Sequence, residues 1–277
     1  MDEYEPNRCG RRGFLTAAVS VTSAAGLLGR SRPASAAPVD AAVGHVRFGA
    51  HALRVVDLTH KLTRQFNFDP AHPRISFESV DGSGVAVGMK MHRLSLIEHV
   101  GTHMDAPSHF GESLSSLGQI PIQDLVVPLA IVDLTEKFAQ STDAQLELAD
   151  IERWEMRHGP LPDGCCVAMD TGYDLLTLAA SPPTSRRLQM PGFSVEAARM
   201  LAEKRRVKGI AVDSGTIDAG PNVPSYPVHQ YWLRSGRWGI EGITNLKAVP
   251  AVGALLIAGA PPVENATGMP IRAIALF

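Results

Sequence analysis

Cysteine is scarce in this chain of 277 residues, which has three cysteines. Cys9 lies in the N-terminal leader described below, and the other two are adjacent, at Cys165 and Cys166. Adjacent cysteines rarely pair, because the bridge would strain the peptide between them, so the fold cannot depend on a disulfide framework. Both lie in an apolar run, and we expect them in a buried strand rather than in a redox or metal site.

An excess of charge of either sign is also lacking. The 26 basic and 28 acidic side chains give a formal net charge of −2, which offers no global electrostatic reason to bind nucleic acid or an anionic membrane. Apolar residues make up 45% of the chain and charged residues 19%, which excludes wholesale disorder. No internal repeat or charged block divides the sequence, and its length suffices for a sizeable core.

The N-terminus has the pattern of an export leader. Arg11-Arg12 is followed by Phe14-Leu15, an almost uncharged run over 16–29, and Ala34-Ser35-Ala36. A basic start, a short apolar stretch and an Ala-x-Ala site are typical of a secretory signal, and the paired arginines resemble the twin-arginine type. The run is too short and too rich in Ala, Ser and Thr for a membrane span. We predict a signal peptide over 1–36 and a periplasmic or extracellular protein, with an uncleaved anchor or an N-terminal amphipathic helix as alternatives.

The rest of the chain predicts a linker over 37–54 and a single mixed α/β domain over 55–277. Apolar runs predict strands over 55–59, 125–134, 209–213, 254–258 and 271–277, and alternation predicts a strand pair over 86–94. Pro128 favours a sheet edge or a boundary within its strand. Helices are expected over 150–158 and from Ser194 to 204, with Ser194 as the N-cap.

Three histidines and an aspartate gather within 11 residues: His99, His103, Asp105 and His109. All four stand at odd-numbered positions, so an extended segment places them on one face, whereas a helix would divide them. Imidazole nitrogen and carboxylate oxygen are the ligands of catalytic zinc, and Mn²⁺ or Fe²⁺ fits the same set. We therefore predict an extended segment that binds a metal, with two ions if the carboxylate bridges.

The pattern His-x-Gly-Thr-His-x-Asp-x-Pro-x-His over 99–109 resembles the signature of the cyclase family of metal-dependent hydrolases, which includes bacterial kynurenine formamidases and isatin hydrolases. Further segments resemble this family in the same order, over 191–198, 211–218, 227–229, 239–246 and 268–273. The resemblance implies a swivelling β/α/β-type fold, a homodimer, and one or two zinc ions per chain, with a single Mn²⁺ in isatin hydrolase-like members.

The resemblance also implies residue roles. His99, His103 and Asp105 would bind the first ion, and Asp105 would bridge to a second ion held by His229 and Glu241. His109 stands where the family has its proton donor and acceptor, a role that suits imidazole because it titrates near neutral pH.

The predicted activity is therefore hydrolysis of a small-molecule amide by a metal-activated water, with an aryl formamide as the first substrate class. An isatin-type lactam is the alternative, and a lactonase or a dehydratase could use the same site. A non-catalytic exported protein that binds a metal or a ligand is the second class of function.

Some positions depart from the family or leave the substrate open. Asp170 and Tyr173 stand where many relatives carry Arg and Trp. Arg186 or Arg187 could hold a substrate carboxylate, although solvated surface positions suit them better. Three aromatic residues could line a pocket or pack in the core: Phe66, Phe68 and Trp232.

Overall fold

Four parallel strands form the centre of the main sheet in the computed structural model, which describes residues 42–64, 66, 73–80, 89–176 and 189–277. They are β6 (Val126–Asp133), β8 (Cys166–Asp170), β10 (Gly209–Val212) and β11 (Trp238–Glu241). Such strands read as continuous apolar runs because both faces of the sheet are covered. All described residues belong to one unit, Asp40–Phe277, which confirms a single mixed α/β domain. The predicted leader over 1–36 lies outside the described residues.

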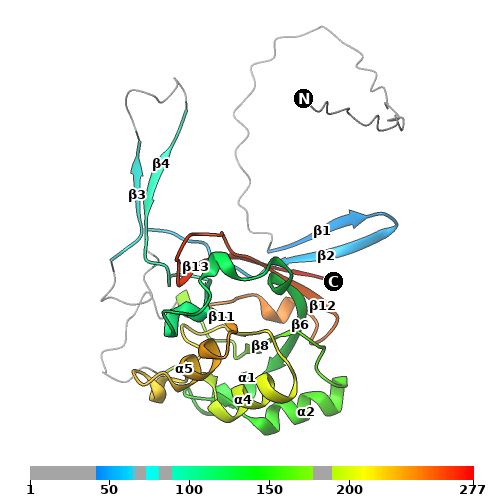
Figure 1. Cartoon of the computed structure of the whole chain (residues 1–277). Coiled ribbons are helices and arrows are strands. Elements are labelled where there is room, and N and C mark those ends of the chain that lie inside the picture. The colour runs from blue at the N-terminus through cyan, green and yellow to red at the C-terminus, as the bar shows by residue number, and fades with distance from the viewer. Residues whose placement is uncertain (1–41, 65, 67–72, 81–88, 177–188) are drawn as a thin grey trace, which may run out of the picture. The chain divides into compact units, whose positions relative to one another are not determined.

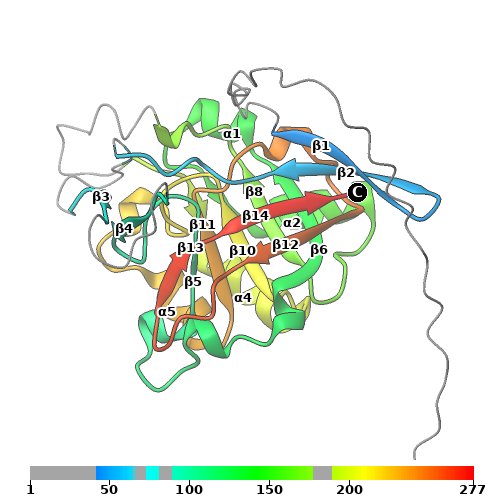
Figure 2. The same cartoon turned by 90° about the horizontal axis from the view of Figure 1, so that it is seen from above.

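Antiparallel strands complete this ten-stranded sheet, in the order β1-β2-β14-β12-β6-β8-β10-β11-β5-β13. Their bounds are β1 Val43–Phe48, β2 His51–Asp57, β5 His103–Asp105, β12 Ala254–Gly259, β13 Gly268–Pro270 and β14 Arg272–Leu276. Only Ile271 separates β13 from β14, yet β13 pairs with β5 and β14 pairs with β12 and β2. The sheet therefore curls back on itself, and β12 and β14 cross over the parallel strands (Figure 2).

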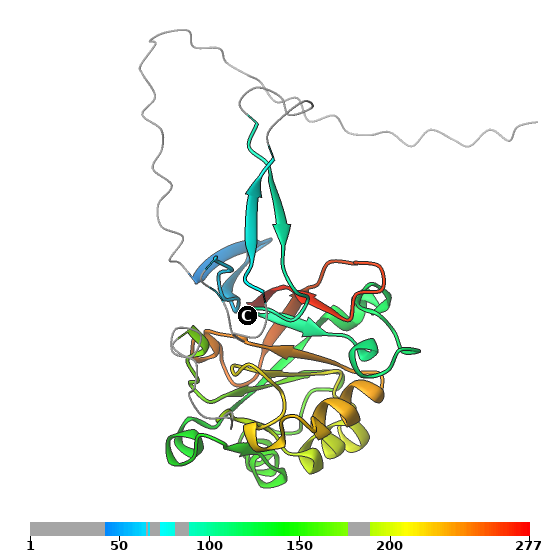
Figure 3. The same ribbon diagram turned by 90° about the vertical axis from the view of Figure 1, so that its left-hand side faces the viewer.

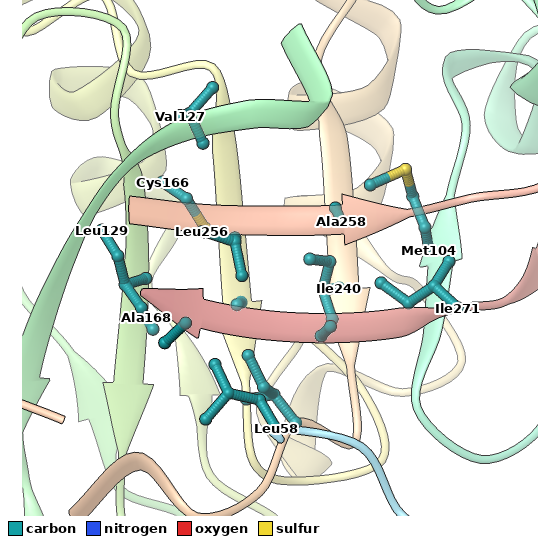
Figure 4. Close-up of a cluster of buried hydrophobic side chains, with 14 of the residues drawn as sticks. Leu58, Met104, Val127, Leu129, Cys166, Ala168, Ile240, Leu256, Ala258 and Ile271 are labelled. Atoms are coloured by element: carbon teal, nitrogen blue, oxygen red, sulfur yellow. The ribbon is translucent and has the colours of Figure 1, made fainter. Parts of the chain in front are cut away.

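The curled sheet has a hydrophobic core on each face. The inner core lies between the parallel strands and β12 and β14, and includes Met104, Leu129, Ala168, Ile240 and Leu256 (Figure 4). The outer core lies between the sheet and three helices, α2 (Leu148–His158), α4 (Val195–Lys204) and α5 (Pro227–Arg234) (Figure 1).

Local signals explain the helix starts. The Ser194 hydroxyl accepts a hydrogen bond from the Ala197 N–H at 3.1 Å, so the predicted N-cap of α4 is confirmed. Helix α2 begins two residues earlier than expected, after Glu147. Proline at the first position of α5 is preorganised for a helix, although the sequence did not lead us to expect one there.

Shorter elements connect these parts. They are α1 (Thr135–Gln140), the paired strands β7 (Gln145–Leu146) and β9 (Gly192–Phe193), and single turns of 3₁₀ helix. Strands β3 (Ser76–Ser79) and β4 (His92–Ser95) form a separate hairpin that projects from the sheet (Figure 3). The expected strand pair over 86–94 matches this hairpin in β4 only, because residues 86–88 lie outside the described part. Among the described residues, none of the helices has the length and apolar character needed to cross a membrane.

Two expectations differ from the structure. The linker over 37–54 is wrong for residues 43–54, which form β1 and the start of β2, because this hairpin completes the sheet beyond β14. Strand β6 is not an edge strand, since it lies between β12 and β8. Pro128 is tolerated because pairing with β8 begins only at Leu129, which is the boundary that the proline favoured.

Two side-chain expectations are settled by burial. Cys165 and Cys166 are unpaired thiols with no exposed surface, and burial raises the pKa of the Cys165 thiol to about 12, as suits a core position. Trp232 is fully buried in the outer core, and its indole N–H donates to the Trp238 carbonyl at 2.8 Å. Trp232 therefore packs in the core and does not line a pocket.

Candidate metal centre

The short strand β5 places two functional side chains on the face opposite the inner core. Met104 points into that core, so its neighbours His103 and Asp105 project from the other side, as alternation in a strand requires. Glu241 lies directly opposite His103 in the register of β11. The cross-strand neighbours of Asp105 are Gly239 on β11 and Gly268 on β13, which leaves room for other side chains to approach its carboxylate.

His229 reaches the same point from the first turn of α5. The Asp218 carboxylate accepts hydrogen bonds from the backbone N–H groups of Val228 (2.8 Å) and His229 (3.1 Å), and therefore caps this helix. It also lies 2.7 Å from His229 Nδ1. Because a carboxylate only accepts, Nδ1 carries the proton and Nε2 is directed into the centre.

The remaining two histidines arrive by separate turns. Gly101, with φ of +71°, turns the chain between His99 and β5, and His109 lies on a 3₁₀ turn, Pro107–Phe110. The expectation of one extended segment is therefore wrong, because a glycine turn and a proline-initiated turn interrupt it. The four side chains still meet: His99 Nδ1 lies 2.7 Å from Asp105 Oδ1, and the rings of His99 and His109 stack with centroids 3.9 Å apart.

Ligand atoms from four of these residues surround one point. His103 Nε2 lies 3.3 Å from Asp105 Oδ1 and 3.4 Å from Glu241 Oε2. His229 Nε2 lies 3.3 Å from Asp105 Oδ2 and 3.0 Å from Glu241 Oε1. Two ligands that each bind zinc at about 2.0–2.1 Å in tetrahedral geometry are separated by about 3.3 Å. The spacing thus matches neighbouring ligands of a metal ion.

Unpartnered polar atoms support the same interpretation. His103 Nε2 and Asp105 Oδ2 are buried, and neither makes a hydrogen bond within the described structure. His103 Nδ1 donates to the Gly101 carbonyl at 3.1 Å, which directs Nε2 into the centre. Leaving a nitrogen and a carboxylate oxygen buried without partners is costly, so an occupant that accepts both lone pairs fits this place.

The residues can be grouped into more than one ligand set. Ligand atoms of His99, His103 and Asp105 lie within 4.8 Å of one another, and so do those of Asp105, His109 and His229. Asp105 belongs to both sets and could bridge two ions. Since His109 belongs to the second set only, it could act either as a ligand of that ion or as a proton carrier beside it.

The two carboxylates at the centre and the imidazoles beside them shift one another's pKa values. Burial would raise the pKa of Asp105, but the neighbouring imidazoles, that of His103 foremost, hold it well below its usual value. Glu241 likewise has a lowered pKa despite its burial. Burial opposes protonation of His103, yet the carboxylates of Asp105 and Glu241 raise its pKa to about 10, and the pKa of His229 is raised for the same reason. The two negative charges thus hold protons on the neighbouring imidazoles and would equally attract a cation.

His109 differs from these histidines. Burial lowers its pKa to about 4, with the Asp105 carboxylate acting in the opposite direction and the His99 imidazole in the same one. At neutral pH its imidazole is uncharged and can accept a proton. Phe110 lies against its edge at 4.9 Å between ring centroids.

Aromatic side chains border the centre on one side. Rings of Phe110 and Tyr226 lie 5.0 and 5.4 Å from the His229 ring. Phe66 packs in a small third core with Val100 and Leu175, and therefore does not face solvent. Phe68, Arg186 and Arg187 lie outside the described residues, so their suggested substrate contacts stay predictions.

Asp218 was not expected in the site from the sequence. The only signal for it was its place at the end of a family-like segment, since its partners lie 10 and 11 residues further along the chain. Two more polar residues that contact the centre, Glu98 and Thr267, were also missed.

Comparison with known proteins agrees with this geometry. The family model described as "Putative cyclase" matches residues 56–219. An isatin hydrolase of Roseibium aggregatum is 33% identical over 195 residues, which cover 65% of this chain and 72% of the relative. A kynurenine formamidase of Polaromonas naphthalenivorans is 24% identical over 229 residues, covering 81% of this chain and 92% of the relative. The solved structure of isatin hydrolase A from Labrenzia aggregata bound to benzyl benzoate superposes with a TM-score of 0.74 at 32% identity, covering 81% of this chain and 93% of that one.

Proposed function

Since this chain belongs to the cyclase family of metal-dependent hydrolases, we propose that it hydrolyses a cyclic amide of the isatin type. The observation that carries the proposal is the convergence of three imidazoles and two carboxylates around buried, unpartnered atoms, with a fourth imidazole beside them. The lactam takes precedence over the aryl formamide that the sequence favoured, because the isatin hydrolase relative is more similar than the formamidase.

Five residues would hold the metal. His99, His103 and Asp105 would hold one ion, and Asp105 would also help to hold a second ion together with His229 and Glu241. Zinc suits this set of nitrogen and oxygen donors, and a single Mn²⁺ is the alternative. When bound, the metal supplies an activated water and polarises the amide carbonyl.

His109 would move the protons of the reaction. Its uncharged imidazole would accept a proton as water adds to the carbonyl carbon, and would return it to the nitrogen as the carbon–nitrogen bond breaks. A lactam would thereby open to a carboxylate and an aromatic amine. His99 and His103 cannot do this while their lone pairs face the metal, whereas His109 stands beside the five proposed ligands, with its ring stacked on that of His99.

A substrate comparison with metal-loaded protein tests the proposal. The purified protein would be reconstituted with zinc or with Mn²⁺, and its kcat/KM measured on isatin, an aryl formamide and an aryl lactone. We expect isatin to be preferred at least tenfold, with His45→Ala as a control variant because His45 is an exposed histidine on β1.

Other results would redirect the assignment. A preference for the formamide would restore the formamidase reading, and activity on the lactone alone would indicate a lactonase. Metal-loaded protein that turns over none of these substrates and no hydroxy acid would point to a binding protein.

Two further properties belong to the same proposal. Residues 1–36 would direct export through the twin-arginine route, so replacing Arg11 and Arg12 by lysine should retain the protein in the cytoplasmic fraction. The mature chain would form a homodimer, which size-exclusion chromatography with light scattering would detect as twice the chain mass. Its only partner would be a small-molecule substrate, with no affinity for nucleic acid.

A further inference from the structure

His99 Nε2, the ring nitrogen that faces away from Asp105, is linked by hydrogen bonds to Thr267 and Glu98, two residues with no part in the proposed reaction. His99 Nε2 lies 3.0 Å from the Thr267 hydroxyl oxygen. That hydroxyl lies 2.5 Å from Glu98 Oε2, and the Thr267 backbone N–H donates to the same oxygen at 3.1 Å. Thr267, in the loop before β13, thus contacts both the His99 imidazole and the Glu98 carboxylate.

The hydrogen bonds among Glu98, Thr267 and His99 can be assigned donors and acceptors in one way. A carboxylate accepts hydrogen bonds and does not donate them, so the single hydroxyl proton of Thr267 is given to Glu98. The Thr267 oxygen is then left to accept from His99, which requires a proton on Nε2. We propose that Glu98 and Thr267 are positioning residues that fix His99 with Nε2 protonated and Nδ1 presented to the metal.

The other two imidazoles at the centre are held in a comparable way. His103 donates from Nδ1 to the Gly101 carbonyl, and His229 donates from Nδ1 to the Asp218 carboxylate. Ligand histidines commonly give their second N–H to such an acceptor, which fixes the tautomer and the ring orientation. His99 is the reverse case, because its Nδ1 faces Asp105 and its Nε2 faces outward.

Packing limits the His99 ring to this orientation. A side chain at Gly268 would lie 2.5 Å from His99 Cε1 and 2.9 Å from Nδ1, so the backbone next to Thr267 lies directly against the ring. The His109 ring stacks on it at 3.9 Å. With the ring plane fixed by packing, the Thr267 oxygen accepts from Nε2, so Nδ1 is the nitrogen that a metal can bind beside Asp105.

The test isolates the hydroxyl from the loop. Thr267→Val removes the hydroxyl but keeps the backbone N–H that binds Glu98, and Thr267→Ser restores the hydroxyl. Thr142→Val is the matched control, because Thr142 is exposed. Thermal melting would establish that each variant is folded, and zinc affinity would be measured by competition with a chromophoric chelator.

Ring ¹⁵N–¹H spectra of the zinc-loaded protein supply a second readout. We expect His99 to bind zinc through Nδ1 and to show an Nε2–H that exchanges slowly with water. Thr267→Val should weaken zinc binding about 10–100-fold and expose this proton to exchange, while Thr267→Ser stays within about threefold of the wild type. Glu98→Ala and Thr267→Val should be non-additive, because they break the same chain.

The inference rests on the proposed metal centre, and the two can fail separately. Wild-type protein that binds no zinc would overturn the metal centre itself. Wild-type binding together with an unchanged affinity and an unchanged His99 signal in Thr267→Val would overturn the positioning role alone. A loss that Thr267→Ser does not restore would also overturn it, since a merely structural contact would then explain the result.

Discussion

Replacing Gly268 by alanine should weaken zinc binding as well as destabilise the fold. The new Cβ would lie 2.5 Å from His99 Cε1 and 2.7 Å from the Met104 carbonyl oxygen. Ordinary contact begins near 3.4 Å, so the ring must move by about 0.9 Å or β13 must move away from β5. A metal ligand that is displaced by more than about 0.5 Å no longer fits the geometry of its ion. Because His99 would move further than this, we expect zinc affinity to fall at least tenfold. Overpacking of this kind should also lower the free energy of unfolding by about 1–3 kcal/mol.

The control for this variant is Gly44→Ala. Gly44 lies on β1, and no atom lies within 4 Å of the position that its Cβ would occupy. Chelator competition and thermal melting would be run on both variants, and Gly44→Ala should match the wild type in zinc affinity. If Gly268→Ala also bound zinc with wild-type affinity, the position of His99 would not matter to the metal, and our assignment of His99 as a ligand would be wrong.

Three further outcomes follow from the structure. His109→Ala should lower kcat about 10²–10⁴-fold while zinc content stays unchanged, and loss of zinc would instead make His109 a ligand. His103, with a pKa of about 10, holds a proton at pH 7, and the pKa of His229 is raised by the same carboxylates. Binding a divalent ion should therefore release at least one proton, and affinity should rise at least about tenfold per pH unit between about pH 7 and 9. Calorimetry in buffers of different ionisation enthalpy would count these protons, and a count of zero would contradict the protonation states. Two hydrogen bonds from Arg205 lower the pKa of Glu155, so Arg205→Ala should lower the free energy of unfolding by about 0.5–1 kcal/mol at pH 7, whereas the control Lys204→Ala, at an exposed residue, should not. Urea titrations in the acid range should show this difference vanish as the pH falls through the lowered pKa of Glu155.

The parts of the fold that could be predicted are those with local signals. The α4 helix follows from Ser194 and an apolar face, and the strands over β10, β12 and β14 follow from uninterrupted apolar runs. Strand β1 and the start of β2 gave a weaker signal, because most of their side chains are exposed. They form because β14 offers an edge with which β2 pairs, which no local pattern encodes.

The residues at the candidate site likewise differ in whether a local sequence signal marks them. His99, His103, Asp105 and His109 lie close together in the sequence, so their composition alone indicated a metal site. Their geometry could not be derived, because Gly101 and Pro107 turn the chain where an extended segment was expected. The family resemblance, and not spacing, pointed to His229 and Glu241.

The supporting residues lie beyond any local pattern. Thr267 is 169 residues from its partner Glu98, and Asp218 contacts an imidazole on a helix that begins after a separate turn. Their side chains are common on protein surfaces, and beyond the place of Asp218 at the end of a family-like segment no pattern distinguishes them from solvated residues. Only the curling of the sheet, which brings β13 beside β5, places the Thr267 loop next to His99.

Chemistry and stability are coupled to different degrees across this centre. His103 and Asp105 flank Met104 on a three-residue strand held between β11 and β13, so any change that shifts one of them also disturbs the inner core. His109 lies on a 3₁₀ turn outside the sheet, where its ring stacks on that of His99 and meets that of His229 edge-on. Variants of β5 therefore cannot separate loss of metal from loss of fold, whereas variants of His109 can. For this reason the proton-transfer role can be tested by kinetics, and the ligand roles must be tested by metal affinity together with melting.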